Sequence, residues 1–225
     1  MNDTLDVTVA VIAKECLPGK VKTRLVPPLS PVDAARLAQL SLSRTLATVR
    51  QLPVRRRLLV MDGTPIETDE EGFTVLPQVR GGLDERLAAI CDIVSSPLLI
   101  VGMDTPQLAS AHLAPLFRDW ASAGGHDAWM GPAVDGGFWG LALRHPDGGM
   151  VRGVPMSTDR TGADQRARLV ALGLSVGALP ELRDMDYFSD AVQIAGDIPG
   201  SRFAAAVSAL EPGARSTMLR KKGCE

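Results

Sequence analysis

Residues 7–25, VTVAVIAKECLPGKVKTRL, join an apolar run to a loop that is rich in positive charge. The run over residues 7–13 holds mostly small and β-branched side chains, a pattern typical of a strand that is buried on both faces. Three cations follow it within the loop: Lys20, Lys22 and Arg24. Because ligands of open α/β sheets bind beyond the carboxyl ends of the strands, this loop predicts an anion-binding site. The alternative is a solvated basic loop.

Strand and helix patterns alternate along the rest of the chain. We expect further strands at residues 56–62, 73–78, 97–104, 127–133, 137–143 and 174–180. We expect helices at residues 31–49, 83–94, 110–122, 160–172, 190–194 and 203–210, with Ser30 as the cap of the first and Pro31 at its first position. This alternation favours a Rossmann-like α/β fold, with a mixed, mostly parallel sheet flanked by helices. We expect one domain over residues 1–210 and a disordered basic tail over residues 211–225.

Composition narrows the classes of protein that fit. The chain has 225 residues, of which 45% are hydrophobic, so it can bury a sizeable core. A formal net charge of −2 argues against binding to nucleic acid or to an anionic membrane. The three cysteines are far apart in sequence, which fits a reducing cytosol. With no signal-peptide pattern and no apolar run long enough to span a bilayer, we expect a cytoplasmic protein.

Lys14 and Asp104 are charged residues at the ends of apolar strands. A lysine at the end of a buried strand is awkward to solvate, which makes Lys14 a candidate ligand of phosphate. A carboxylate at the end of a central strand is a hard oxygen ligand of the kind that Mg²⁺ uses together with substrate phosphates. The alternative for Asp104 is that it caps the turn that follows.

Two further acidic segments follow. Asp135 and two glycines lie between extended segments in GPAVDGGFWGLAL, residues 131–143, as in a hairpin turn. The aromatic pair directly after them would form a wall for an acceptor molecule. In LPELRDMDYFSDA, Asp186 is where a second metal carboxylate would come from, whereas we interpret Asp184 as a helix cap.

Four motifs together resemble a known family. AKECLPGKVKTRL, VGMDTPQL, GPAVDGGFWGLAL and LPELRDMDYFSD occur in this order and at this spacing in a bacterial glycosyltransferase-like family of unknown function, built on the nucleotide-diphospho-sugar transferase (GT-A) fold. The first motif, with LSPVDAARLAQLSLSRTL after it, is also similar to 2-phospholactate guanylyltransferase, a relative with the same fold. The resemblance covers roughly residues 7–195.

The resemblance implies roles for specific residues. Those implied to bind the nucleotide are Lys14, Gly19, Lys20, Lys22, Arg24, Gly81, Gly82 and Arg86, the last of them reaching phosphate or a neighbouring acid. Those implied to line the acceptor side are Asp135, Gly136, Gly137, Phe138, Ser157 and Thr158. The implied catalytic set is Lys22, Arg24 and Asp104, and Asp104 and Asp186 are implied to hold Mg²⁺ or Mn²⁺.

The chain departs from the usual pattern of the family at two places. PQVRGGLDERL has Gly82 where relatives have an acid and Asp84 where they have a glycine, and Met156 replaces a tryptophan. The resemblance therefore leaves the base and the acceptor open.

We expect a Mg²⁺-dependent, nucleotide-using transferase. The first interpretation is a nucleotidyltransferase that joins an NTP to a small phosphate or phosphonate acceptor, because a basic loop suits the highly charged pyrophosphate that leaves. The alternative is a glycosyltransferase that uses a nucleotide-sugar donor. A second alternative is a non-catalytic nucleotide-binding protein on the same fold. The expected partners are a nucleotide and a small-molecule acceptor, without nucleic acid or membrane, and a homodimer is left open.

Overall fold

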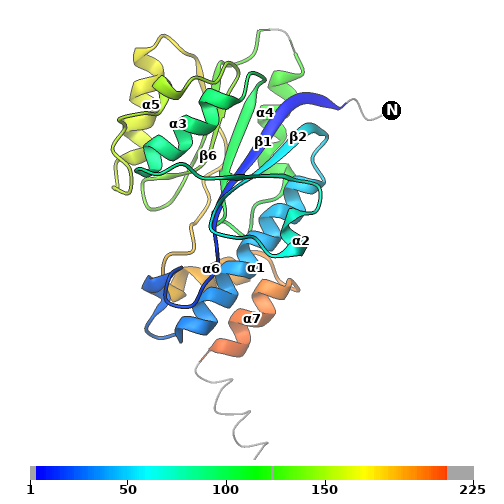
Figure 1. Ribbon diagram of the computed structural model, residues 1–225, viewed down its shortest axis with the longest axis vertical. Coiled ribbons are helices and arrows are strands. Elements are labelled where there is room, and N and C mark those ends of the chain that lie inside the picture. Colours follow the sequence, from blue (N-terminus) through cyan, green and yellow to red (C-terminus); the bar gives the residue numbers. More distant parts are fainter. Residues whose placement is uncertain (1–3, 123, 212–225) are drawn as a thin grey trace, which may run out of the picture.

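The computed structural model describes residues 4–122 and 124–211 (Figure 1), so the predicted basic tail lies outside the described residues except for Glu211. The strands are β1 (Leu5–Lys14), β2 (Val54–Asp62), β3 (Thr74–Pro77), β4 (Leu98–Gly102), β5 (Ala128–Pro132), β6 (Phe138–Leu143) and β7 (Val176–Ala178). They form one seven-stranded sheet in the order β3-β2-β1-β4-β6-β5-β7. β6 runs antiparallel to β4 and β5, and the other neighbouring pairs are parallel. The predicted mixed, mostly parallel sheet is confirmed.

Helices connect most of the strands. They are α1 (Pro31–Arg50), α2 (Glu67–Glu70), α3 (Leu83–Ile93), α4 (Ser110–Trp120), α5 (Thr161–Ala171), α6 (Phe188–Asp197) and α7 (Arg202–Leu210), with the 3₁₀ turns η1 (Thr23–Leu25) and η2 (Gly148–Met150). Every predicted helix is present. The sequence pattern does not reveal α2, η1 or η2, because a single turn is too short to show an apolar period. No described helix is both long and apolar enough to cross a membrane.

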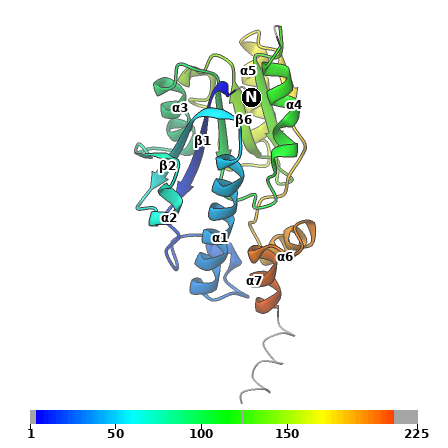
Figure 2. The same ribbon diagram turned by 90° about the vertical axis from the view of Figure 1, so that its right-hand side faces the viewer.

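The helices cover both faces of the sheet (Figure 2). On one face, Leu42 of α1 and Leu113 of α4 belong to the same buried cluster as Val9 and Val11 of β1. On the other face, α3 and α5 pack on a second cluster that contains Ala10. Successive β1 residues therefore enter opposite cores, which is the two-residue period of a strand buried on both faces.

The start of α1 follows the predicted capping pattern. Ser30 is its N-cap residue, and the Ser30 hydroxyl accepts a hydrogen bond from the backbone N–H of Asp33 at 3.1 Å. Pro31 occupies the first helical position, where its missing N–H has no partner to lose. The sequence therefore places this helix start correctly.

A third buried cluster lies at the lower end of the molecule, where α6 and α7 pack beside the N-terminal part of α1 (Figures 1 and 2). Leu37 of α1 and Phe203 of α7 are members of this cluster. Residues from outside these helices join it, among them Leu25 at the end of the basic loop and Met185 in the segment before α6. This core therefore holds the basic loop and the segment before α6 close together.

Candidate active site

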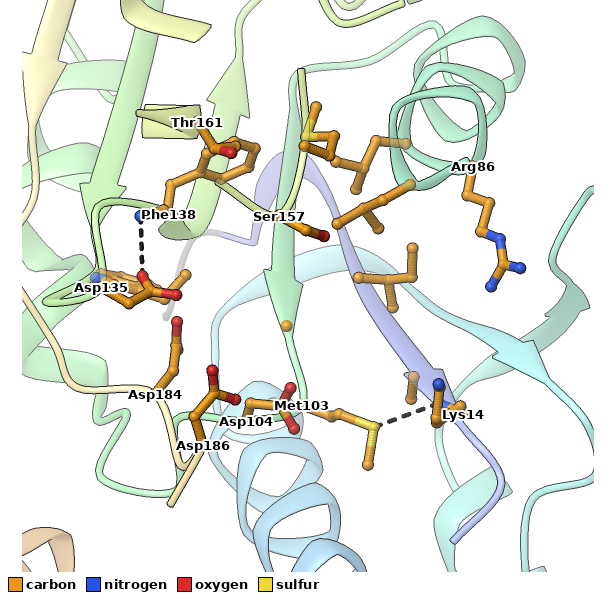
Figure 3. Close-up of a pocket in the computed structure, with 18 of the residues that line it drawn as sticks. Lys14, Arg86, Met103, Asp104, Asp135, Phe138, Ser157, Thr161, Asp184 and Asp186 are labelled. Carbon is orange, nitrogen blue, oxygen red and sulfur yellow. Dashed lines mark hydrogen bonds between the residues drawn. The ribbon is translucent and has the colours of Figure 1, made fainter. Parts of the chain in front are cut away.

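A cavity of about 830 Å³ opens at the carboxyl ends of the central strands (Figure 3). Lys14 is the last residue of β1, Asp104 follows the end of β4, and Asp135 lies in the turn between β5 and β6. β1 and β4 are parallel neighbours, so their carboxyl ends meet at one edge of the sheet. All three side chains line the cavity, as their positions after apolar strands predict.

Most of the residues that the sequence singles out line this cavity. They are Lys14, Lys20, Lys22, Arg24, Gly81, Arg86, Asp104, Asp135, Gly137, Phe138, Ser157, Thr158 and Asp186. Three predicted glycines shape the backbone nearby instead: Gly19 turns the basic loop with a φ of 76°, Gly82 is the N-cap residue of α3, and Gly136 has a φ of 87°. A Cβ atom at Gly136 would collide with the carbonyl oxygen of Asp159, so only glycine allows this close approach.

The ammonium group of Lys22 lies between two carboxylates. Its Nζ is 3.0 Å from Asp104 Oδ2 and 3.3 Å from Asp186 Oδ1, and only 7% of the side chain is exposed. Arg24 Nη1 donates to the other oxygen of Asp186 at 2.9 Å, from a side chain that is 64% exposed. Burial by itself would lower the pKa of Lys22, but the attraction of the two carboxylates outweighs burial and raises this pKa. Lys22 is therefore a sequestered, charged ammonium.

Buried neighbours bring these distant residues together. Leu25 of η1 and Met185 are both 0% exposed and belong to the core formed with α6 and α7. Met185 separates Asp184 from Asp186, and these two aspartates line the cavity. The backbone N–H of Met185 also donates to the carbonyl of Asp104 at 3.0 Å, which ties the segment to the end of β4.

One carboxylate oxygen of Asp104 lacks a hydrogen-bond partner among the described residues. Helix α4 begins at Ser110 with Ala109 as its N-cap residue, so Asp104 does not cap the next helix. Oδ2 of Asp104 contacts Lys22, whereas Oδ1 is buried and has no hydrogen-bond partner among the described residues. A buried carboxylate oxygen without a partner is unfavourable unless a bound group satisfies it. This favours the ligand interpretation of Asp104 over the capping interpretation.

The capping interpretation of Asp184 is wrong. Helix α6 begins at Phe188, and the carboxylate at its N-terminus belongs to Asp190, which accepts from the backbone N–H of Tyr187 at 2.8 Å. Asp184 precedes this turn and points elsewhere. The sequence misled because aspartate before a helix is common in caps, and two candidates stood in the same short segment.

Asp184 instead faces the cavity, between Asp135 and Asp186 (Figure 3). Its carboxylate makes no hydrogen bond or ion pair with any residue in the part of the chain that the structure describes. Burial, and then the negative charges of Asp104 and Asp135, raise the pKa of Asp184 to about 7. Asp184 is thus a fourth carboxyl group of the site, which the sequence pattern missed.

Arg86 lies on the other side of the cavity. Its Nη1 donates to Asp62 Oδ2 and to Gln78 Oε1, each at 3.1 Å. Of the two expected partners, phosphate or a neighbouring acid, Arg86 contacts the acid. Gln78 in turn donates from Nε2 to the carbonyl of Ala13 at 2.6 Å, which fixes its amide beside β1. No sequence pattern pointed to Gln78, because a lone glutamine after a short strand is uninformative.

The basic and acidic side chains of the cavity come largely from different segments of the chain, and they meet where Lys22 and Arg24 pair with Asp186. One wall of the cavity, which we call the basic side, is formed by Lys14, Lys20, Lys22, Arg24 and Arg86. The wall contributed by residues 135–187 is called the acidic side. It presents the carboxylates of Asp135, Asp159, Asp184 and Asp186 and the hydroxyls of Ser157, Thr158, Thr161 and Tyr187. Among the described residues, that stretch adds no Lys, Arg or His to the lining.

Aromatic and turn residues complete the acidic side. Phe138 faces the cavity (Figure 3). Trp139 also lines it, and the buried Trp139 ring donates from its Nε1 to the carbonyl of Pro180 at 3.0 Å. Asp135 accepts a hydrogen bond from the N–H of Gly137 at 2.9 Å, so it both closes the β5–β6 turn and lines the cavity. Both residues of the predicted aromatic wall therefore line the cavity.

The carboxylates fit a divalent ion that also binds the substrate. Within residues 4–122 and 124–211, no three His, Cys, Asp or Glu side chains are grouped so as to hold a metal ion alone. Asp104 and Asp186 lie on either side of one ammonium group, and Asp104 keeps an unpaired oxygen. Mg²⁺ is commonly bound by one or two carboxylates, with water and substrate phosphates completing the shell. The residues present match that requirement.

Solved structures resemble this fold. A "putative nucleotide-diphospho-sugar transferase" from Desulfovibrio desulfuricans G20 is 21% identical over 92% of this chain and 94% of its own, with a TM-score of 0.76. CMP:2-keto-3-deoxy-manno-octonic acid synthetase, with CTP bound, is 12% identical over 82% of this chain and 95% of its own, with a TM-score of 0.53. At these identities the likeness shows the fold, and it confirms the nucleotide-diphospho-sugar transferase fold that the motifs indicate.

Sequence comparison with curated proteins gives no match. One family model, described as "Uncharacterized protein conserved in bacteria (DUF2064)", matches residues 45–158. This match spans half of the chain, including β2 to β6 and the Asp104 and Asp135 motifs. The chain therefore belongs to this bacterial family, as the four ordered motifs led us to expect.

Proposed function

We propose that this protein is a metal-dependent transferase that uses a nucleotide substrate. The observation that carries the proposal is the pair formed by Asp104 and Asp186 around the Lys22 ammonium, at the carboxyl ends of two central strands. Basic residues for phosphate and carboxylates for a hard metal ion meet at this point. This is the place where ligands bind in open α/β sheets.

Each side of the cavity has a distinct part in this proposal. Lys14, Lys20 and Arg24 are placed to bind phosphate oxygens, with Arg86 near them on α3. Asp104 and Asp186 would hold Mg²⁺ or Mn²⁺. When bound, that ion would neutralise the negative charge that develops on the phosphoryl oxygens. The acidic side is left for the acceptor.

Nucleotidyl transfer is the first candidate reaction. An acceptor oxygen attacks the α-phosphorus of an NTP, the bond from that phosphorus to the bridging oxygen breaks, and pyrophosphate leaves. Five cations on the basic side support this reaction, because the triphosphate tail is the most highly charged part of the substrate. The structurally similar CMP:2-keto-3-deoxy-manno-octonic acid synthetase, with CTP bound, offers a precedent for nucleotide binding on this fold.

Glycosyl transfer is the second candidate, and the acidic side favours it. A phosphate or phosphonate acceptor there would lie among Asp135, Asp159 and Asp184, with no cation from the same wall. The negative charges of the acceptor and of these carboxylates would repel each other strongly in a cavity from which water is partly excluded. A neutral acceptor would instead hydrogen-bond to these carboxylates through its hydroxyl groups and pack on Phe138, an arrangement that suits a sugar or another polyol.

One experiment separates these candidates. The protein is incubated with Mg²⁺ and each NTP or nucleotide-sugar in turn, in the presence of matched acceptor pairs such as glycerol and glycerol 3-phosphate. Release of pyrophosphate indicates nucleotidyl transfer, and release of a nucleoside diphosphate indicates glycosyl transfer. Product formed from the alcohol alone would assign the acidic side to neutral acceptors.

The non-catalytic alternative makes the opposite predictions for metal. It requires nucleotide binding that is indifferent to Mg²⁺ and unchanged in Asp104→Asn. Calorimetric titration of nucleotide with and without Mg²⁺ decides between an enzyme of the proposed type and a binding protein. Nucleotide that fails to bind under either condition would reject the whole proposal.

A further inference from the structure

We infer that Lys22 is a tethered cation that takes the place of a divalent ion in the free protein, so that the metal binds only together with the nucleotide. The inference rests on the proposed function, and it goes beyond it by naming the form of the substrate. The species that the site accepts is the metal–nucleotide complex. A metal ion that arrives without a nucleotide meets carboxylates whose negative charge Lys22 already neutralises.

The contacts of Lys22 are those expected of such a cation. One nitrogen lies 3.0 Å from Asp104 and 3.3 Å from Asp186, the two residues that would hold the metal. The side chain is only 7% exposed, so little solvent screens these contacts. A divalent ion placed between the same carboxylates would stand beside a charged ammonium, and the repulsion would oppose its binding.

The backbone holds Lys22 in place. Lys22 has φ 48° and ψ 44°, a left-handed conformation that is uncommon for residues other than glycine. Val21 and Leu25 on either side are buried, which fixes the loop against the core. The fold therefore keeps Lys22 in an unfavourable backbone conformation that brings its ammonium to the carboxylates, and local strain of this kind is frequent at functional sites.

The acidic side explains why a cation is needed there. Asp135 and Asp184 line the same cavity as Asp104 and Asp186, and the negative charges of Asp104 and Asp135 already act on Asp184. Without a metal, this group of carboxylates requires a nearby positive charge, and Lys22 supplies it. When a nucleotide binds, its phosphate oxygens offer the ammonium new partners, and the flexible lysine stem lets it turn toward them. The carboxylates are then open to the metal that the phosphates bring.

The test measures metal binding rather than turnover. Mn²⁺ alone is titrated into nucleotide-free wild type, Lys22→Met and Lys22→Met/Asp104→Asn, and bound ion is followed by electron paramagnetic resonance. We expect Lys22→Met to bind Mn²⁺ at least tenfold more tightly than wild type, and the double variant to lose this gain. Arg55→Met is the control, because Arg55 does not line the cavity and pairs with the exposed Asp6. It should bind Mn²⁺ as wild type does.

Two results would overturn the inference. One is wild type that binds Mn²⁺ as tightly as Lys22→Met, and the other is a gain in Lys22→Met that persists without Asp104. Because the expected effect is a gain, a misfolded variant cannot imitate it, and Lys22→Gln offers the same comparison should Lys22→Met not fold. Titration of each NTP into the same proteins tests the proposed function separately. If Lys22→Met gains Mn²⁺ binding but none of the proteins binds a nucleotide, Lys22 keeps its role as the cation between the carboxylates and the proposed transferase function is rejected.

Discussion

Replacing Asp104 with asparagine tests the proposed metal site directly, because the side chain keeps its shape and loses its charge. In the folded protein, Lys22 would lose its contact at 3.0 Å and keep Asp186 at 3.3 Å. Breaking a fully buried pair costs about 3–5 kcal/mol, whereas exposed pairs contribute about 0–1 kcal/mol. Asp104 is 40% exposed and Lys22 retains a partner, so we expect a loss near 1 kcal/mol in the free energy of unfolding. For a chain of this size, that lowers Tm by about 2–4 °C.

The effect on function should be much larger than this effect on stability. An amide oxygen is a poorer ligand than a carboxylate for a hard dication, so the phosphoryl charge would be incompletely neutralised. Losing one such electrostatic contact lowers turnover by roughly 10²–10³. Before the acceptor is known, the same loss is measurable by calorimetry as nucleotide binding that Mg²⁺ no longer strengthens.

Asp6→Asn is the matched control for this experiment. Asp6 forms an exposed ion pair with Arg55 at 3.3 Å and does not line the cavity. Its replacement should leave both the melting temperature and the Mg²⁺ dependence of nucleotide binding unchanged. An Asp104→Asn protein that binds nucleotide with the Mg²⁺ dependence of wild type would refute the metal assignment, whatever its stability.

Three further predictions follow from the site. Arg24→Ala should weaken nucleotide binding about tenfold without changing Tm, because this side chain is largely exposed. Lys22→Ala should lower both the nucleotide affinity and Tm, because its ammonium is buried. If the loop were purely structural, these variants would lower Tm alone. The carboxyl of Asp184 has its pKa raised from 3.8 to about 7, so the folded state binds the extra proton and loses stability as pH rises from about 4 to 7. Asp184→Asn should therefore melt above wild type at pH 8 and equal to it at pH 4, and a pH-independent difference would contradict this. Met185→Ala should lower the free energy of unfolding in urea by about 2–5 kcal/mol. It should also weaken nucleotide binding, because Met185 anchors the segment that carries Asp186. Unchanged nucleotide binding in the folded variant would argue against that anchoring.

Local sequence pattern determined the elements of the fold and one end of the site. The apolar run before Lys14 and the one before Asp104 are strands because their side chains enter cores on both faces of the sheet. Parallel strands end at the same edge of a sheet, so the sequence alone predicts that these two residues lie at one end of it, and the structure makes β1 and β4 neighbours. The capping of α1 by Ser30 is equally local, because it depends on residues only three positions apart.

Only the tertiary structure decided how the charges are paired. Lys22 and Asp186 are 164 positions apart, and no local pattern reports that they touch. They meet because Leu25 and Met185 are buried in one core with α6 and α7. The same packing turns Asp184 into the cavity rather than onto the helix end. Packing of α3 against β2 in the other core places Arg86 beside Asp62. Periodicity and spacing record what a segment does with its neighbours in sequence, whereas the position of a buried charge depends on which distant surfaces the core brings together.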